Sequence, residues 1–537
     1  MMENFQSDIL VVGSGAAGLR AAIAAGQSGR KVCVISKGPT GLGTSTSLSY
    51  GILAGVREEG SLEKHREMTL RTGRGINQPE LVDVLVEEGP LRLQELLNWG
   101  IQAMSHQGSL FVKGRPLVWG ERIVRCLLDK ARGLGVQLVG GLTVCKVLVV
   151  DGMFGVLAYS VKEDKWVVFT TQSLVLAAGG AAALYLRHDN PGQILGEGYI
   201  LALDTGAILQ DMEFVQFHPA GLAEPGLPRI LLPSSLMDKG RIVNGRGHEI
   251  LHKYQLQAGT ASKQARDFLS QAIYHEIQKE GGEVWLDLRS IPEEGWAEDP
   301  TSDSIREILW ERYGAKNRPF RVAPITHFVM GGVKIDPYGA TSVPGFYAAG
   351  EVTGGLHGAN RMRGNALTET LVFGARAGES AAKWVEGVHA KSERDIFEGL
   401  EAFLSGFRKR TVGVNPTNLK RRLREILWNR VGVIRNQQDL KKAQEEVEGI
   451  LEESSQISFG NNPGGIKRTL MLQYAARTAL LIIKAALMRE ESRGAHFRED
   501  FPSQDDDRWL GHLLVSLGRE GEKWSFEPVS KKNSVKF

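Results

Sequence analysis

Short apolar runs at the start of the chain predict a β-α-β unit. Residues 9–12 form an apolar run bounded by glycine, with the length typical of a buried strand. Small and apolar residues follow at 16–27 and predict a helix, and the run 31–35 predicts a second buried strand. This order of elements indicates an α/β fold built on a parallel sheet.

Three glycines join the first predicted strand to the helix. Gly13, Gly15 and Gly18 follow the G-x-G-x-x-G spacing, which in this β-α-β context indicates a dinucleotide site. The first glycine allows a tight turn, the second lets the backbone approach a pyrophosphate, and the third lets helix and strand pack closely. The second strand ends in Ser36-Lys37 and not in an acidic residue, which argues against NAD.

Apolar runs farther along the chain predict an antiparallel meander. They lie at 144–150, 154–159 and 166–171, and polar turns separate them. A fourth run, 173–178, predicts a strand that ends in the pair Gly179-Gly180. We expect this strand to reach the same dinucleotide, because glycine allows close approach of the backbone.

The pattern of apolar and polar residues changes in the middle of the chain and indicates an inserted domain. After a proline-rich start at residue 222, the pattern predicts a helix over 261–279, a strand over 284–288 and a helix over 304–313. From Ala323 on, the sequence again has the apolar and polar pattern of the dinucleotide domain. We therefore expect an α+β capping domain inserted into the dinucleotide domain.

The pattern beyond Asp395 is helical and charged. Candidate helices lie at 428–433, 439–451 and 465–489, and the residues after 517 read as a loosely attached tail. The expected architecture is a doubly wound, Rossmann-like α/β domain with two additions. The boundaries are 1–221 and 323–388 for the dinucleotide domain, 222–322 for the capping domain and 389–537 for the C-terminal helical domain and tail.

Composition limits the function classes. The chain has 537 residues, too many for one ordinary core, and its 42% hydrophobic and 24% charged residues are those of a globular protein. A net charge of +3 gives no reason to expect nucleic acid. The three cysteines are scattered, so we expect no metal site and no iron–sulfur cluster held by this chain alone.

The same survey predicts a cytoplasmic protein. The first strand begins within eight residues, which leaves no room for a signal peptide. No run of about eighteen apolar residues is present, so we expect no membrane span. Association with a membrane would then depend on partner subunits.

Seven motifs lie in order along the chain. Two of them are His-Gly-Ala-Asn-Arg-Met-Arg-Gly-Asn-Ala-Leu at 357–367 and Glu-Ser-Arg-Gly-Ala-His-Phe-Arg-Glu-Asp-Phe-Pro at 491–502. The others are 196–198, 211–219, 324–333, 344–352 and 431–435. With these motifs the chain resembles the flavoprotein subunits of succinate dehydrogenases and fumarate reductases, and the related L-aspartate oxidases.

The resemblance implies FAD as the cofactor. Glu197 and Glu351 match family positions that contact FAD through carboxylates. Asn365 would open a helix whose positive end suits a reduced flavin, and it could also be an ordinary N-cap. The implied cofactor-binding residues are Gly13, Ser14, Gly15, Ala16, Ala17, Gly18, Ser36, Lys37, Thr44, Ser45, Gly51, Ala178, Gly179, Glu197, Glu351, Asn365, Ala366 and Leu367.

The resemblance also predicts how the flavin is held. Family members with covalent flavin use a histidine in the loop after the second strand, and alignment on Gly51 puts Thr44 there. No histidine occurs between Lys37 and Gly55. We therefore expect non-covalent FAD.

For the substrate, the resemblance implies two histidines and an arginine that bind a dicarboxylate. His218, His327 and Arg361 occupy these positions, and donor groups of this kind suit a carboxylate. Counted from the Arg-Asp pair at 266–267, Gln271 stands where the family has an arginine that exchanges a proton. Glutamine has no proton to exchange at neutral pH, so Lys239, Arg241 or Arg266 would have to replace it.

Leu232-Pro233 stands where the family has a Thr-Glu pair. Because these departures gather on the substrate side, we expect a working flavin and a substrate other than simple succinate or fumarate. Three functions stay open: an FAD subunit that acts on a carboxylate and exchanges electrons with a separate iron–sulfur protein, an electron relay without dicarboxylate activity, and an L-aspartate oxidase.

Overall fold

The protein is described by a computed structural model. It covers residues 3–56, 61–114, 119–257, 259, 266–278, 282–387, 393–407, 415–456 and 463–529.

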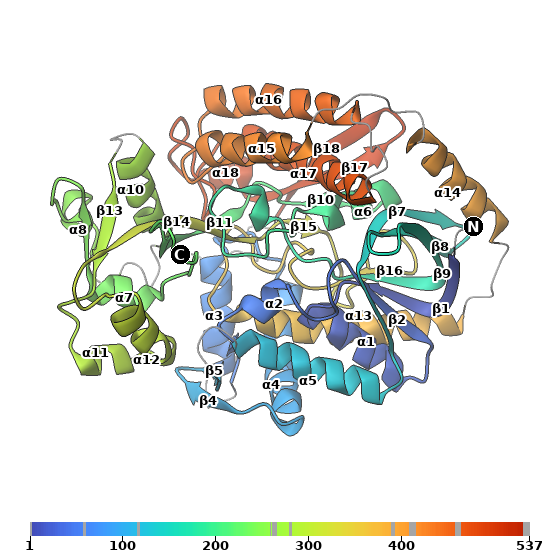
Figure 1. The fold of residues 1–537 in the computed structure, drawn as a ribbon, viewed down its shortest axis with the longest axis horizontal. Coiled ribbons are helices and arrows are strands. Elements are labelled where there is room, and N and C mark those ends of the chain that lie inside the picture. The colour runs from blue at the N-terminus through green and yellow to red at the C-terminus, as the bar shows by residue number, and fades with distance from the viewer. Residues whose placement is uncertain are drawn as a thin grey trace.

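A seven-stranded sheet forms the centre of the largest domain (Figure 1). Strand β1 (Glu3–Val12) pairs in parallel with β2 (Val32–Ser36) on one side and β9 (Lys165–Leu176) on the other, and α1 (Ala16–Gln27) connects β1 to β2. The order is β6-β2-β1-β9-β8-β7, with β16 beside β9. The remaining bounds are β6 Gln137–Gly140, β7 Leu142–Val150, β8 Met153–Ser160 and β16 Phe346–Ala348. The predicted α/β fold is confirmed.

The predicted meander is β7, β8 and β9, which pair antiparallel in that order. The expectation of separate strands at 166–171 and 173–178 was wrong, because both runs belong to β9. Gln172 between them is no turn former, and β1 pairs in parallel with β9 on both sides of it, from Val167 to Leu176.

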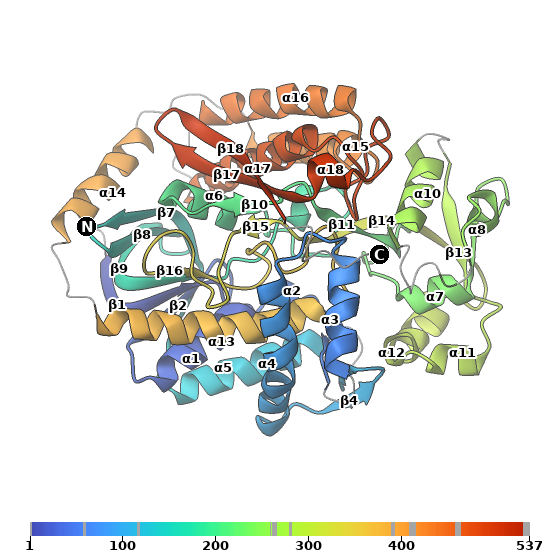
Figure 2. The same cartoon turned by 180° about the vertical axis from the view of Figure 1, so that it is seen from behind.

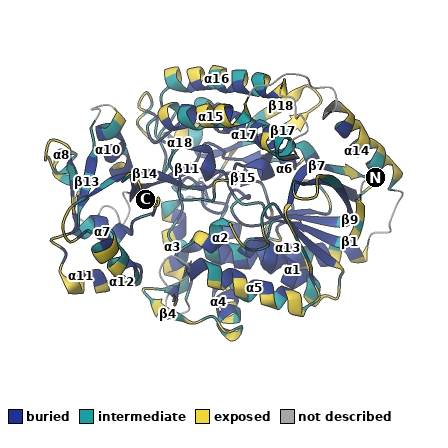
Figure 3. Cartoon of the chain, in the orientation of Figure 1, coloured by how far each residue is buried: buried dark blue, intermediate teal, exposed yellow. Residues whose placement is uncertain are grey.

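Helices cover the sheet. Helix α13 (Asn365–Glu386) lies directly on α1, and a Cβ atom at Gly378 would come within 2.1 Å of the Ala21 carbonyl oxygen, so only glycine permits this approach. Figure 2 shows α13 and α1 beside α5 and α4 below the sheet. The bounds of the other N-terminal elements are α2 Ser45–Leu48, β3 Ile52–Ala54, α3 Ser61–Thr72, α4 Pro79–Asn98, β4 Ala103–His106, β5 Ser109–Val112 and α5 Trp119–Gly133. Buried residues concentrate in this sheet and on the inner faces of these helices (Figure 3).

The segment between β11 (Val215–Leu222) and β14 (Phe320–Val329) forms a lobe beside the main body (Figure 1). We call this lobe the cap. A sheet of order β11-β14-β13-β12 runs from the main body into it. Its other elements are α7 Ser234–Lys239, β12 Arg241–Asn244, α8 Ile250–Lys253, α10 Arg266–Gln278, β13 Val284–Asp287, α11 Glu293–Ala297, α12 Pro300–Glu307 and η2 Ile308–Arg312. The predicted helix 304–313 is thus divided between α12 and η2, and positions 261–265 and 279 of the other predicted helix lie outside the described residues.

The C-terminal helices lie on the other side of the main body from α13 (Figure 1). They are α14 Arg394–Phe407, α15 Pro416–Arg430, α16 Gln437–Ser455, α17 Pro463–Met488 and α18 Asp506–Trp509. The expectation of a loose tail was wrong for part of it, because β17 (Gly511–Gly518) and β18 (Gly521–Pro528) form a hairpin paired with β10 (Leu209–Gln210). Of the predicted helix at 428–433, only residues 428–430 are helical, and they form the end of α15. The smaller elements of the main body are η1 Ala182–Leu184, α6 Glu197–Thr205 and β15 Gly332–Val333.

One helix among the described residues, α17, has the length and composition of a membrane span. Within the fold, 78% of the apolar window in Gly464–Met488 is buried. Packing against α15, α16 and α6 therefore accounts for its apolar character.

Candidate active site

A cavity of about 430 Å³ extends from the start of α1 to the cap. Most of the residues predicted from the sequence line it. They are Gly13, Ser14, Gly15, Ala16, Ala17, Ser36, Lys37, Thr44, Ser45, Gly51, Ala178, Gly179, Glu197, Glu351, Ala366 and Leu367, together with His218, His327 and Arg361. Gly18, Asn365 and Gln271 are not among its lining residues.

The glycine turn leaves room for a ligand and for the helix. Gly13 has a φ of +116°, and a Cβ atom there would lie 2.0 Å from the Ala177 carbonyl oxygen. A Cβ atom at Gly18 would lie 2.0 Å from the Gly13 carbonyl oxygen. Gly18 therefore allows the helix to approach the turn, while the N-terminus of α1 faces the cavity and suits a pyrophosphate.

Two carboxylates in the cavity suit the hydroxyl groups of a nucleotide. Glu197 forms an ion pair with Lys37, so two predicted cofactor contacts hold each other in place. Burial raises the pKa of Glu351 to about 8, and its Oε1 accepts a hydrogen bond of 3.2 Å from the Val329 amide. A Cβ atom at Gly180 would lie 2.1 Å from Glu351, so glycine keeps this carboxyl group in position. These residues fit FAD.

Asn365 opens α13, as expected, and the alternative that it is the N-cap of this helix was wrong. Gly364, with a φ of +89°, is the N-cap of α13, and Asn365 is the first residue of the helix. Its side chain is fully buried, bonds His65 Nε2 at 2.8 Å and donates to Thr69 Oγ1 at 2.9 Å. Asn365 thus ties α13 to α3 and sets the position of Ala366 and Leu367 at the cavity.

The two predicted histidines come from neighbouring strands. His218 on β11 and His327 on β14 have ring centroids 6.4 Å apart. Burial, and then the nearby Arg266, lower the pKa of His218 well below its usual value, so its imidazole is neutral. His327 Nδ1 lies 2.6 Å from Asp189 Oδ2, and this bond orients the ring.

Arg361 is a buried guanidinium without a carboxylate partner among the described residues. Its exposed fraction is 4%, it lies 4.6 Å from the centre of the Phe328 ring, and Nη1 donates to the Met362 carbonyl at 3.3 Å. Its Nε has no partner within the described part of the chain. Burial, and then the charge of Arg266, lower the pKa of Arg361 to about 10. An anion is therefore the ligand that this site favours.

The structure places Arg266, and not Gln271, on the cavity. Both belong to α10, and only Arg266 is a lining residue. Of the other suggested replacements, Lys239 bonds Glu298 and the Gly295 carbonyl, and Arg241 lies near the surface. Burial lowers the pKa of Arg266, and Asp267 opposes this effect.

Sequence reasoning missed several lining residues. Tyr50, Asp189 and Arg363 line the cavity, but each has a hydrogen-bond partner more than sixty positions away along the chain, which no local spacing reveals. Of the two positions expected to carry a Thr-Glu pair, Pro233 lines the cavity, and Leu232 is fully buried and is not a lining residue. Leu231 also lines the cavity, so this part of its wall is apolar.

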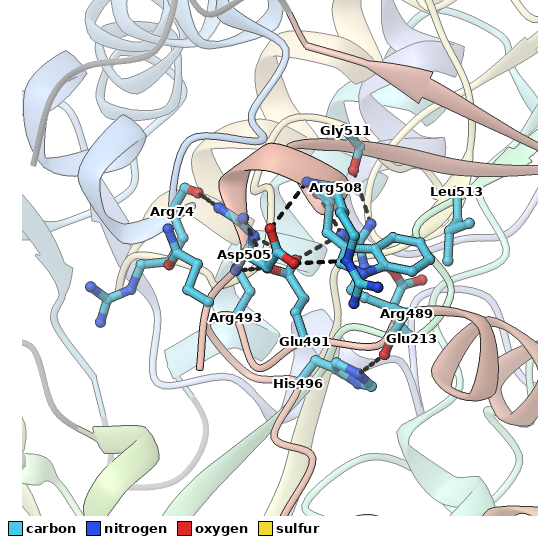
Figure 4. Close-up of polar contacts among 12 residues, drawn as sticks. Arg74, Glu213, Arg489, Glu491, Arg493, His496, Asp505, Arg508, Gly511 and Leu513 are labelled. Carbon is cyan, nitrogen blue, oxygen red and sulfur yellow. Dashed lines mark hydrogen bonds and ion pairs between the residues drawn. The ribbon is translucent and has the colours of Figure 1, made fainter. Parts of the chain in front are cut away.

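The C-terminal motif braces the loop that carries Arg361. Figure 4 shows Arg493 between Glu491 and the carbonyl oxygen of Arg74, to which its Nη1 donates at 2.8 Å. The Ala495 amide donates to the Ala359 carbonyl at 2.9 Å, two residues before Arg361. The motif at 491–502 therefore holds the loop before Arg361 in place, although none of its own residues lines the cavity.

Comparison with known proteins agrees with this geometry. The FAD binding domain family matches residues 8–367, and the fumarate reductase flavoprotein C-terminal family matches residues 420–536. The chain is 33% identical to a fumarate reductase (CoM/CoB) subunit of Methanothermobacter marburgensis, over 96% of this chain and 98% of the relative. It is 32% identical to the L-aspartate oxidase of Saccharolobus solfataricus, over 95% and 99%.

Among solved structures, a quinol-fumarate reductase with menaquinol molecules matches with a TM-score of 0.89 and 28% identity, covering 98% of this chain and 99% of that chain. FAD is therefore the cofactor for which the cavity is built. The chain belongs to the flavoprotein subunits of the fumarate reductase and succinate dehydrogenase family.

Proposed function

We propose that this flavoprotein interconverts a small unsaturated carboxylate and its saturated form, and exchanges electrons with a separate iron–sulfur subunit. The observation that carries the proposal is the convergence of Arg361, His218, His327 and Arg266 on one cavity. Fixed donors of this kind bind a carboxylate and stabilise charge that develops next to it.

Each residue has a role that follows from its surroundings. Arg361 binds the substrate carboxylate, because its guanidinium is buried and has no carboxylate of its own among the described residues. Neutral His218 and the Asp189-oriented His327 hold the same substrate by hydrogen bonds. Arg266, whose pKa is lowered, is the acid.

When bound, FAD supplies the hydride in the direction of reduction. In that direction Arg266 would donate its proton to one carbon of the substrate double bond, and the other carbon would receive the hydride that bound FAD supplies, which would give the saturated acid. The neutral Arg266 then regains a proton from solvent. The two electrons consumed in each turnover come from the partner subunit.

The cysteines support a separate electron carrier. Cys33, Cys126 and Cys145 are free thiols, and Cys33 and Cys145 are buried in different strands. An iron–sulfur cluster commonly needs four cysteine ligands, so the cluster must belong to another chain. Such a partner could also attach this protein to a membrane.

A second candidate is an electron relay without dicarboxylate activity. The apolar Leu231 and Pro233, which line the cavity, favour it, since the resemblance led us to expect a Thr-Glu pair at the positions of Leu232 and Pro233. The same apolar wall also fits an active enzyme, if its substrate is an unsaturated acid with an apolar second substituent. The similarity to an L-aspartate oxidase adds L-aspartate as a compound to test.

The test is a single-turnover experiment on the FAD-loaded chain, purified with its partners. The flavin is reduced photochemically, and fumarate, crotonate or cinnamate is added under anaerobic stopped flow. We expect reoxidation by at least one of these acids, and a loss of about a hundredfold or more in R266Q. The control Q271A should stay within about threefold of wild type. No reoxidation by any of them, with an iron–sulfur protein in the preparation, would favour the relay, and bleaching of oxidised flavin by L-aspartate would favour the oxidase.

A further inference from the structure

The cap and the main body meet in a hydrogen bond beside the active site. The side-chain amide of Asn360 donates to Asp267 with an Nδ2···Oδ2 distance of 2.7 Å. Asp267 follows Arg266 in the first turn of α10, and Asn360 precedes Arg361 in the loop of the main body. The bond thus joins the immediate neighbours of two guanidinium groups that face the same cavity.

The Asn360 side chain is fixed on the side of the main body. Its Oδ1 accepts hydrogen bonds from Gln216 Nε2 at 2.6 Å and from the Arg361 amide at 2.9 Å. The residue is buried, so these bonds are shielded from solvent. Asn360 therefore presents its amide group to the cap in one orientation.

The remainder of α10 is held by other bonds. Ser270 donates to the Phe217 carbonyl at 3.2 Å, and the Tyr274 hydroxyl donates to the Trp428 carbonyl at 2.7 Å. These contacts lie one or more turns beyond Arg266. Among these bonds, the one from Asn360 acts on the first turn itself.

We propose that the Asp267–Asn360 hydrogen bond sets the first turn of α10 in register with the main body, and so positions Arg266 against a carboxylate held by Arg361. This inference rests on the proposed function, in which Arg266 is the acid. Asp267 and Asn360 are positioning residues, since neither is a lining residue of the cavity.

A competing role for Asp267 is proton relay to Arg266. Burial raises the pKa of Asp267 to about 6, and Arg266, Arg74 and the Asn360 bond each oppose the rise. A relay needs a carboxyl group at position 267, whereas a positioning bond needs only an acceptor oxygen. The variant D267N separates the two, because its amide oxygen still accepts from Asn360 but carries no exchangeable acid.

The experiment compares D267A, D267N, N360A and the double variant D267A/N360A as FAD-loaded chains. Reoxidation of the reduced flavin by the active acid should fall about tenfold to a hundredfold in D267A and N360A, since a displacement near 1 Å costs that much. D267N and the matched control S270A should stay within about threefold of wild type. The double variant should be no slower than the slower single variant. Malonate affinity, followed by the flavin absorbance, should stay within about threefold in D267A, because Arg361 is untouched.

Hydrogen exchange gives a readout that does not need turnover. Backbone amides in the first turns of α10 should exchange faster in D267A and N360A than in wild type, D267N and S270A. This result can be obtained even if no unsaturated acid reoxidises the flavin. In that case the proposed function would be refuted, but the role of the Asp267–Asn360 bond in ordering α10 would still be supported. Unchanged exchange and unchanged rates in D267A would overturn the proposal. A D267N rate as low as that of D267A, with the exchange of α10 unchanged from wild type, would replace it by a role of the Asp267 charge, either in proton relay or in raising the pKa of Arg266.

Discussion

Replacing Arg489 by methionine should destabilise the protein by about 4 kcal/mol, as expected for removing one partner of a buried ion pair. The Arg489 guanidinium is fully buried and pairs with Glu213, and its Nη1 lies 3.0 Å from Glu491 (Figure 4). It also donates to the carbonyl oxygens of Trp509 and Gly511, each at 2.9 Å. Methionine fills part of the volume and satisfies none of these groups. Glu491 keeps another arginine as partner, so Glu213 carries most of the loss.

The loss of stability in R489M should depend on pH. Burial raises the pKa of Glu213 in the folded protein, and Arg489 opposes this rise. Without Arg489 the folded-state pKa rises further above the unfolded value of about 4.3. A carboxyl group of this kind costs stability as the pH climbs from the unfolded pKa to the folded one. The difference between wild type and R489M should therefore be smaller near about pH 5 than near about pH 8.

Unfolding by guanidinium chloride, followed by tryptophan fluorescence at both pH values, measures the effect. The matched control is R508M, since Arg508 pairs with Asp505 at the surface and such pairs contribute about 1 kcal/mol or less. The double variant E213M/R489M removes both charges and should be more stable than R489M alone. An R489M loss no larger than that of R508M, or the same at both pH values, would refute the reasoning.

Three further outcomes follow from the flavin side of the cavity. G13A should purify without flavin colour, because its Cβ atom would lie 2.0 Å from the Ala177 carbonyl, whereas G29A, with nothing within 4 Å, should keep its FAD. Acid precipitation should leave the yellow flavin in the supernatant, and flavin in the washed pellet would contradict non-covalent binding. In the FAD-free protein, burial gives Glu351 a pKa of about 8, so this group costs stability as the pH rises from about 5 to about 8. E351Q should lose less stability over that range than wild type in the same unfolding assay, and an equal loss in both proteins would argue against a buried carboxyl group.

The flavin side could be read from the sequence because its residues act through local geometry. Gly13 and Gly18 belong to one turn, and their spacing alone defines what the backbone does there. Asn365 is a residue whose contacts local sequence patterns could not predict. Its residue type and position at the start of α13 were visible, but its partners His65 and Thr69 lie about three hundred residues away.

The residues on the substrate side depend on which face of a helix meets the cavity. The spacing of residues in the sequence does not reveal that face. Arg266 and Gln271 are five residues apart on α10, which turns the second about 140° away from the first. Only one of them can face a cavity on one side of the helix, and the lining residue is Arg266, next to the Asp267 that accepts the bond from Asn360. Under the proposed function, the acid is therefore Arg266, and the departure that a linear alignment placed at Gln271 does not remove it. The resemblance led us to expect polar residues near Leu231 and Pro233, and these two apolar residues line the cavity, so we expect this wall to determine which substrate fits.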